Sequence, residues 1–185
     1  MGRIVYDMSV SLDGCVASPE GSLDWVAVDV ETHSLFNDEA RAMSAFLLGR
    51  RTYELLQAFW PTADAEPGAE EVILDFAQIW REKPKYVFSR TLESVDSTAT
   101  LMRDVRRDDI ERLKADGDLS VGGPGLARAL IDLGLVDELL MYVNPVVLGG
   151  GTRYLPPVAN PLTLELRESR ALASGVVRLV YTFPH

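Results

Sequence analysis

The order in which apolar segments follow one another limits the fold of this chain more than any other feature. Over the first 135 of its 185 residues, short apolar runs that suit buried strands alternate with amphipathic segments that suit helices. Three strand-like segments without a helix between them then follow, over Val136–Leu148, Leu162–Ser169 and Val176–Phe183. This order predicts one α/β sheet, mostly parallel, that ends in an antiparallel C-terminal ribbon. Because no composition break marks a linker, we expect a single domain over residues 1–185.

Individual helices and strands can be predicted from the same pattern. The clearest helix covers Ala69–Glu82, where apolar residues recur at helical spacing. Further helices are predicted over Glu31–Met43, Arg51–Phe59, Asp108–Ala115 and Leu126–Leu133. Strands are predicted over Arg3–Val10, Ala45–Leu48, Lys85–Ser89, Thr100–Arg103 and Leu119–Val121. The segment Ser11–Asp24 is rich in Gly, Ser, Asp and Pro, which indicates a loop.

Composition narrows the kinds of partner that the chain can have. Its 18 basic and 28 acidic residues give a net charge of −10, so we expect neither a nucleic-acid binder nor a protein of anionic membranes. The longest apolar run, Met141 to Leu148, is far shorter than the roughly 20 residues that span a bilayer. A single cysteine, Cys15, allows no internal disulfide, which fits the reducing cytoplasm, and with two histidines the chain offers no zinc site. A small-molecule partner is the remaining expectation.

One predicted strand end, Gly49-Arg50-Arg51-Thr52, carries residues that suit a phosphate. It joins a strand to a helix, and a helix N-terminus offers free N–H groups and a partial positive charge. The two arginines add planar donor groups and Thr52 adds a hydroxyl. An ordinary solvated pair of arginines at a helix start is the alternative interpretation.

Two further strand ends have comparable properties. Ser89 and Arg90 follow one strand and could bind a phosphate or a ribose oxygen, whereas Lys85 is expected to stay in solvent. Gly122-Gly123-Pro124-Gly125 follows another strand, and its glycines would let the backbone approach a ligand closely. Each is also compatible with an ordinary turn. Because the carboxyl ends of parallel strands meet at one edge of a sheet, one dinucleotide with a pyrophosphate and a 2′-phosphate would explain all three, and arginine beside a ribose favours NADP over NAD.

Five short motifs follow one another along the chain, namely Ser9–Gly14, Gly49–Glu54, Lys85–Leu92, Gly122–Pro124 and Pro145–Gly151. In this order and spacing they resemble the dihydrofolate reductase-like superfamily. Within it, the chain is most similar to the branch related to the reductase domain of the bifunctional riboflavin-biosynthesis deaminase–reductase. The resemblance runs from about Arg3 to Phe183 and implies a mixed sheet of about eight strands flanked by helices, with NADPH bound across the strand ends.

The resemblance also implies roles for individual residues toward NADPH. The phosphates would be bound by Gly49, Arg50, Arg51, Thr52, Ser89 and Arg90 and by the backbone of Gly122, Gly123, Gly125 and Leu126. The nicotinamide would be framed by Ser9, Val16 and Ala17. On the substrate side, Asp13 would shape the loop over the cofactor and Trp25 lies where a planar substrate could bind. The carboxylate of dihydrofolate reductases falls near Val30, so Asp29 and Glu31 are the candidate catalytic acids.

The leading hypothesis is an NADPH-dependent reductase that transfers a hydride to a small heterocycle. It would be similar to 5-amino-6-(5-phosphoribosylamino)uracil reductase of riboflavin biosynthesis, with dihydrofolate reductase as the alternative. Two alternatives of other classes are a non-catalytic NADPH-binding protein and a structural interaction module. The apolar strands Val136–Val147 and Val176–Phe183 suggest a homodimer, although packing within one chain would explain them equally well.

Overall fold

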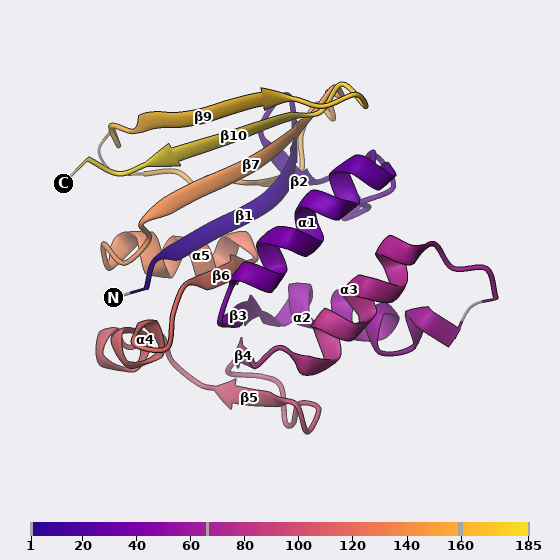
Figure 1. Ribbon diagram of the computed structural model, residues 1–185. Helices are drawn as coiled ribbons and strands as arrows, with labels where there is room; N and C mark the ends of the chain where they lie inside the picture. The colour runs from indigo at the N-terminus through magenta and orange to yellow at the C-terminus, as the bar shows by residue number, and fades with distance from the viewer. Residues whose placement is uncertain (1, 66, 159–160, 185) are drawn as a thin grey trace.

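Eight strands form one mixed sheet at the centre of the computed structural model, which describes residues 2–65, 67–158 and 161–184 (Figure 1). In order across the sheet, the strands are β5 (Ala99–Met102), β4 (Lys85–Phe88), β3 (Ala45–Gly49), β6 (Leu119–Gly122), β1 (Ile4–Ser11), β7 (Glu138–Asn144), β10 (Val177–Thr182) and β9 (Glu165–Ala171). Neighbours from β5 to β7 are parallel, whereas β10 is antiparallel to both β7 and β9. The predicted parallel sheet with an antiparallel C-terminal ribbon is confirmed.

Helices cover both faces of this sheet. They are α1 (Val30–Ala42), α2 (Arg50–Phe59), α3 (Glu71–Glu82), α4 (Arg107–Lys114) and α5 (Pro124–Asp132). On one face α1, α2 and α3 pack with Val5 of β1 in a buried cluster, and Figure 1 shows α1 and α3 on the near side of the sheet. On the other face α4 and α5 pack with Ile4 and Tyr6, because successive strand residues point to opposite faces.

The predicted loop Ser11–Asp24 contains a short strand. Within it β2 (Cys15–Ala17) pairs antiparallel with β8 (Thr152–Arg153), which lies far along the chain. Strands of two or three residues are too short to show an alternating pattern, so the sequence did not reveal them. A 3₁₀ helix, η1 (Trp60–Ala65), directly follows α2, so the helical structure continues past Phe59, where the sequence predicted that it ends.

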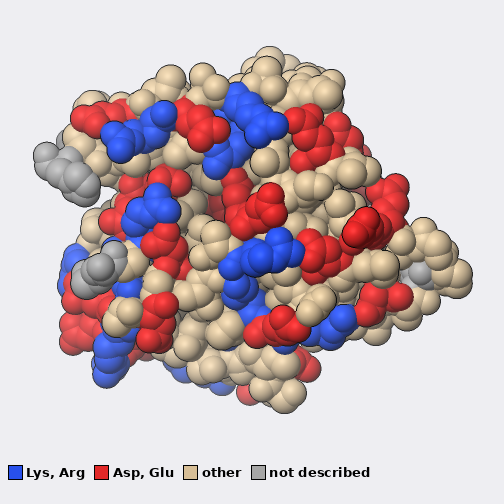
Figure 2. Space-filling model, viewed as in Figure 1, with Lys and Arg blue, Asp and Glu red and all other residues tan. Residues whose placement is uncertain are grey.

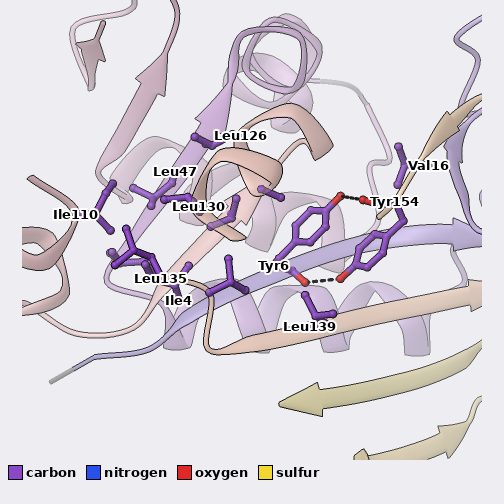
Figure 3. Close-up of a cluster of buried hydrophobic side chains, with 14 of the residues drawn as sticks. Ile4, Tyr6, Val16, Leu47, Ile110, Leu126, Leu130, Leu135, Leu139 and Tyr154 are labelled. Carbon is purple, nitrogen blue, oxygen red and sulfur yellow. Dashed lines mark hydrogen bonds between the residues drawn. The ribbon is translucent and has the colours of Figure 1, made fainter. Parts of the chain in front are cut away.

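Two buried tyrosines fasten the segment after β8 to the central strand (Figure 3). The rings of Tyr6 and Tyr154 stack with centroids 4.3 Å apart. Tyr6 Oη donates a 3.0 Å hydrogen bond to the carbonyl of Tyr154, and Tyr154 Oη donates one of 2.9 Å to the carbonyl of Tyr6. Since β8 pairs with β2, this contact also holds Val16 and Ala17 against the sheet.

The expectation that Lys85 stays in solvent is wrong. Its side chain is 1% exposed, and Nζ donates hydrogen bonds to the carbonyls of Trp80 (2.5 Å) and Lys83 (2.8 Å). The ammonium also lies 4.9 Å from the centre of the Trp80 ring, and burial lowers the pKa of Lys85. The carbonyls at the C-terminus of α3 provide a negative end for this cation, so its stem can be buried.

The apolar C-terminal strands are explained by packing within the chain. Both β7 and β10 have a hydrogen-bonded neighbour on each side, and Leu139, Leu140 and Val180 belong to the core. The outer strand β9 is exposed along its length, and Figure 2 shows side chains of both charges over it. A homodimer therefore stays a prediction.

Within the described parts of the chain, no helix combines the length and the hydrophobicity needed to cross a membrane.

Candidate functional site

A cavity of about 850 Å³ lies at the carboxyl ends of the parallel strands, where α/β sheets bind ligands. It brings together all three of the strand ends that the sequence singled out. The predicted cofactor residues in its lining are Val16, Ala17, Gly49, Arg50, Arg51, Thr52, Ser89, Arg90, Gly123, Gly125 and Leu126. The other two, Ser9 and Gly122, line a neighbouring smaller cavity.

Two helices begin at the wall of the larger cavity, and both begin after a glycine. Gly49 is the N-cap of α2 and Gly123 the N-cap of α5, so neither helix has a side-chain cap. The first-turn N–H groups of α2 are therefore available to a ligand anion, as are those of Gly125 and Leu126 in α5, whose first residue Pro124 has no N–H. The two starts are close, because a Cβ on Gly123 would lie 3.7 Å from the amide nitrogen of Gly49. This pair of uncapped helix starts fits a pyrophosphate.

The arginines of the cavity differ in how far they are neutralised. Arg50 donates to Glu54 (2.9 Å) and Thr91, and Arg90 pairs with Asp104 at 2.7 Å. For Arg51, by contrast, the described part of the chain provides no acidic partner within salt-bridge distance, and its side chain is exposed. Arg51 is thus the guanidinium in this wall with most of its hydrogen-bonding capacity left for a ligand.

Arg103 also lines this cavity, and the sequence analysis missed it. Its Nη1 donates to the carbonyls of Ser89 (3.1 Å) and Leu92 (2.6 Å), which fixes the turn that carries Ser89 and Arg90. Arg103 directly follows β5, so the argument applied to the other strand ends could have found it.

The smaller cavity, of about 240 Å³, lies between the sheet and helices α1, α2 and α3. Its wall is rich in aromatic side chains, which suit a flat ring. They are Phe36, Phe46, Phe76, Trp80 and Tyr142. Met8, Leu23, Thr52 and Leu55 line both cavities, so the two are neighbours with a common wall.

Two carboxyl groups, of Asp7 and Glu39, line the smaller cavity, and the sequence analysis found neither. Glu39 is held by Arg178 at 2.8 Å and by the hydroxyl of Tyr142 at 2.7 Å. Asp7 accepts a 2.8 Å hydrogen bond from Ser120, and burial raises the pKa of Asp7 to about 7. For Asp7 the available signal was an acidic residue in a strand that is otherwise largely apolar, whereas Glu39 is one of several acidic residues in a helix.

The residues predicted for the substrate side lie outside both linings, and each has a structural partner. Asp29 caps α1 by accepting from the amide of Thr32 at 2.8 Å. Glu31 pairs with Arg170 at 2.8 Å and accepts from the amide of Ala173. Their positions therefore do not favour a role in proton transfer, because a proton donor must reach the reacting atom.

Asp13 and Trp25 are likewise engaged within the protein. Asp13 accepts hydrogen bonds from Ser11 and from the amides of Leu148 and Gly149, which hold the pKa of Asp13 at about 2. Asp13 thereby ties the loop after β1 to the segment after β7. The indole of Trp25 donates to the carbonyl of Ser22.

A family model described as the RibD C-terminal domain matches residues 3–178. The chain belongs to this family. The resemblance inferred from the sequence motifs is therefore confirmed. Among relatives, the uncharacterized protein YyaP of Bacillus subtilis is 32% identical over 185 residues, which cover 97% of this chain and 94% of YyaP.

Solved structures agree with this family in fold. A deaminase and 5-amino-6-(5-phosphoribosylamino)uracil reductase from Thermotoga maritima matches with a TM-score of 0.68 and 15% identity, over 99% of this chain and 57% of that protein. Dihydrofolate reductase from Enterococcus faecalis, complexed with NADP(H), matches with a TM-score of 0.64 and 14% identity, over 100% of this chain and 98% of the enzyme. At these identities the likeness shows a dihydrofolate reductase-like fold, as the motifs had predicted.

Proposed function

We propose that the protein is an NADPH-dependent reductase of a small heterocyclic or sugar-like substrate. The observation that carries this proposal is the larger cavity, in which two uncapped helix starts lie in one wall with Arg51, whose guanidinium has no acidic partner among the described residues. Amide donors of this kind suit a pyrophosphate, and an arginine without an acidic partner suits a 2′-phosphate. The family, and NADP(H) in the Enterococcus relative, support the same cofactor.

Each part of the two cavities then has a role. The first turns of α2 and α5 would bind the pyrophosphate, and Arg51 with Ser89 and Arg90 would bind the adenosine end. Once bound, NADPH supplies a hydride. The protein holds the acceptor in the adjoining aromatic cavity, brings the two rings together and excludes water.

The substrate class that the family favours is an aminouracil that carries a sugar phosphate, which is the compound named for the reductase of the Thermotoga protein. Dihydrofolate is the second candidate, supported by the likeness to dihydrofolate reductase. A protein that only binds NADPH is the alternative of another class. The buried cysteine, Cys15, is consistent with a cytoplasmic location.

A thermal melt with saturating NADPH, and separately with NADH, tests the proposal. A ligand at about 100 times its dissociation constant adds about 2.7 kcal/mol to the free energy of unfolding. We expect a large shift with NADPH, a smaller one with NADH, and NADPH oxidation when an acceptor is added. Absence of any shift would contradict the proposal, and a shift without oxidation by a broad panel of acceptors would favour the protein that only binds NADPH.

A further inference from the structure

The smaller cavity contains a carboxyl group that binding of a dinucleotide leaves unused. Asp7 lies on β1, beside Met8, whose side chain lines both cavities. Its Oδ1 accepts the hydrogen bond from Ser120 of β6. No other described residue donates a hydrogen bond to Oδ2. Among the described residues, every side-chain oxygen or nitrogen that is fully buried has a hydrogen-bond partner, so Oδ2 is not fully buried. Oδ2 is therefore open to the cavity.

The described side chains around Asp7 provide no positively charged partner for its carboxyl group. Among the described residues that line this cavity, Glu39 is the charged one that α1 contributes. The sheet contributes Ser9, Ser120 and Tyr142, which are polar but uncharged. The side chains that α2 and α3 contribute are uncharged as well. Arg178 of β10 is bound to Glu39 and to Glu168. Glu39 therefore has a cationic partner, whereas Asp7 has a hydroxyl.

These surroundings favour the neutral form of Asp7. Burial raises the pKa of Asp7 most, and the negative charge of Glu39 raises it further, while the bond from Ser120 lowers it, with a result of about 7. A carboxyl group that holds its proton near neutral pH is suited to donate one, because a general acid works best with a pKa near the working pH. An oxygen open to the cavity is suited to reach a bound ring.

We propose that Asp7 touches the acceptor atom of the substrate and delivers the proton of the reduction. This rests on the reductase function proposed above, in which the carbon of a C=N or C=O bond receives the hydride of NADPH. The π electrons of that bond move to the nitrogen or oxygen, which takes the proton from Asp7 and forms a new N–H or O–H bond. Water then returns a proton to the carboxylate. Ser120 is a positioning residue that holds Oδ1.

The protonation of Asp7 can be measured without a substrate. The infrared C=O band of carboxylic acids is recorded from pH 5 to 9 in protein with ¹³C-labelled aspartate, and the spectrum of Asp7→Asn is subtracted. We expect one acid band that is lost near pH 7. In Ser120→Ala the loss should move to higher pH, because the hydroxyl no longer stabilises the carboxylate. Asp24→Asn, at an exposed position, should leave the band unchanged.

Turnover provides the second readout. NADPH oxidation is followed with dihydrofolate, with 5-amino-6-(5-phosphoribosylamino)uracil and with simple cyclic imines. We expect Asp7→Asn to lower kcat about 100-fold or more with little change in KM, as for loss of a general acid. The rate of the unmodified protein should fall above about pH 7, this limb should be absent in Asp7→Asn, and Ser120→Ala should move it upward.

Two results would overturn the role of Asp7: a carboxylate already ionised at pH 6, or an Asp7→Asn variant with unchanged kcat. The NADPH-induced melting shift separates this failure from that of the reductase. Asp7 does not line the larger cavity, so the NADPH-induced shift should be equal in the unmodified protein and in Asp7→Asn. No shift in either protein, or no acceptor reduced by the unmodified one, overturns the reductase and the role of Asp7 with it.

Discussion

Gly123 has no room for a side chain because Thr52 lies against it. A Cβ at this position would be 2.8 Å from Thr52 Oγ1, and the φ angle of Gly123 is 108°. Both features arise where the turn before α5 meets the first turn of α2. The close approach of these two helix starts, on which the proposed pyrophosphate site depends, therefore requires glycine here.

Replacing Gly123 by Ala should destabilise the protein by about 1–3 kcal/mol, since the new methyl group meets both the strained φ and Thr52. NADPH binding should weaken in parallel because the two helix starts must move apart. Gly125→Ala is the matched control: a Cβ there meets nothing within 4 Å, so stability should be unchanged or rise by up to about 1 kcal/mol. Urea unfolding measures both variants, and equal stability of the two would contradict the packing argument.

Replacing Arg51 by Ala should weaken NADPH far more than NADH. A charge-assisted hydrogen bond contributes about 1.5–3 kcal/mol, which corresponds to a loss of about 10- to 150-fold in affinity for the 2′-phosphorylated cofactor. Calorimetric titration with each cofactor measures the difference. Arg167→Ala, on the exposed outer strand β9, should bind both as the unmodified protein does. Equal losses for NADPH and NADH in Arg51→Ala would exclude the 2′-phosphate role.

The stability of the protein should depend on pH through Asp7. Its pKa is about 7 in the folded protein and 3.8 ordinarily, so between these values the unfolded chain releases a proton that the folded protein keeps. Stability should therefore fall as pH rises from about 4 to 7 and level off above. Each unit of pKa difference is worth about 1.4 kcal/mol. Relative to the unmodified protein, Asp7→Asn should gain stability across this window, by a few kcal/mol at pH 8.

Urea unfolding at several pH values from 4 to 8 checks this dependence. Glu39, whose pKa burial also raises, is present in both proteins, so the difference between them reports Asp7 together with its repulsion of Glu39. Parallel stability curves for the two proteins would show that Asp7 is already ionised in the folded state.

The two hydrogen bonds of the Tyr6–Tyr154 pair should together contribute a different free energy of unfolding from the sum of their separate contributions. Tyr6→Phe and Tyr154→Phe each leave a buried carbonyl without its donor, at a cost of about 1–3 kcal/mol. Because the two hydrogen bonds join the same pair of residues, a double-mutant cycle should give a coupling energy of about 0.5 kcal/mol or more between the two hydroxyl groups. Tyr181→Phe, for which the structure gives no side-chain hydrogen bond among the described residues, should stay within about 0.5 kcal/mol.

The sheet and the larger cavity could be predicted because their signals are local. The strands β3, β4 and β6 are short apolar runs, and each ends in or is followed by glycine or serine that the topology places at one edge of the sheet. Thus Gly49, Ser89 and Gly123, although far apart in sequence, could be assigned to one site before the structure was known.

The smaller cavity could not be predicted, because its chemistry depends on contacts between distant residues. Nothing near Asp7 in the sequence indicates that Ser120 will lie beside it or that Glu39 will face it, and its pKa depends on these neighbours and on burial. Asp29 and Glu31 were chosen by counting from Trp25, and a count does not tell which acids are occupied as a helix cap or an ion pair. For Lys85, the sequence gives no sign that the carbonyls of Trp80 and Lys83 will surround its ammonium group.

The wall common to the two cavities links the binding of the cofactor to the binding of the substrate. Met8, Leu23, Thr52 and Leu55 contact the space on both sides, so a molecule in one cavity becomes part of the boundary of the other. The affinities for two ligands in such an arrangement are linked. If the first ligand raises the affinity for the second by some factor, the second raises the affinity for the first by the same factor. Four side chains without charge can thereby set how strongly each ligand changes the affinity of the protein for the other.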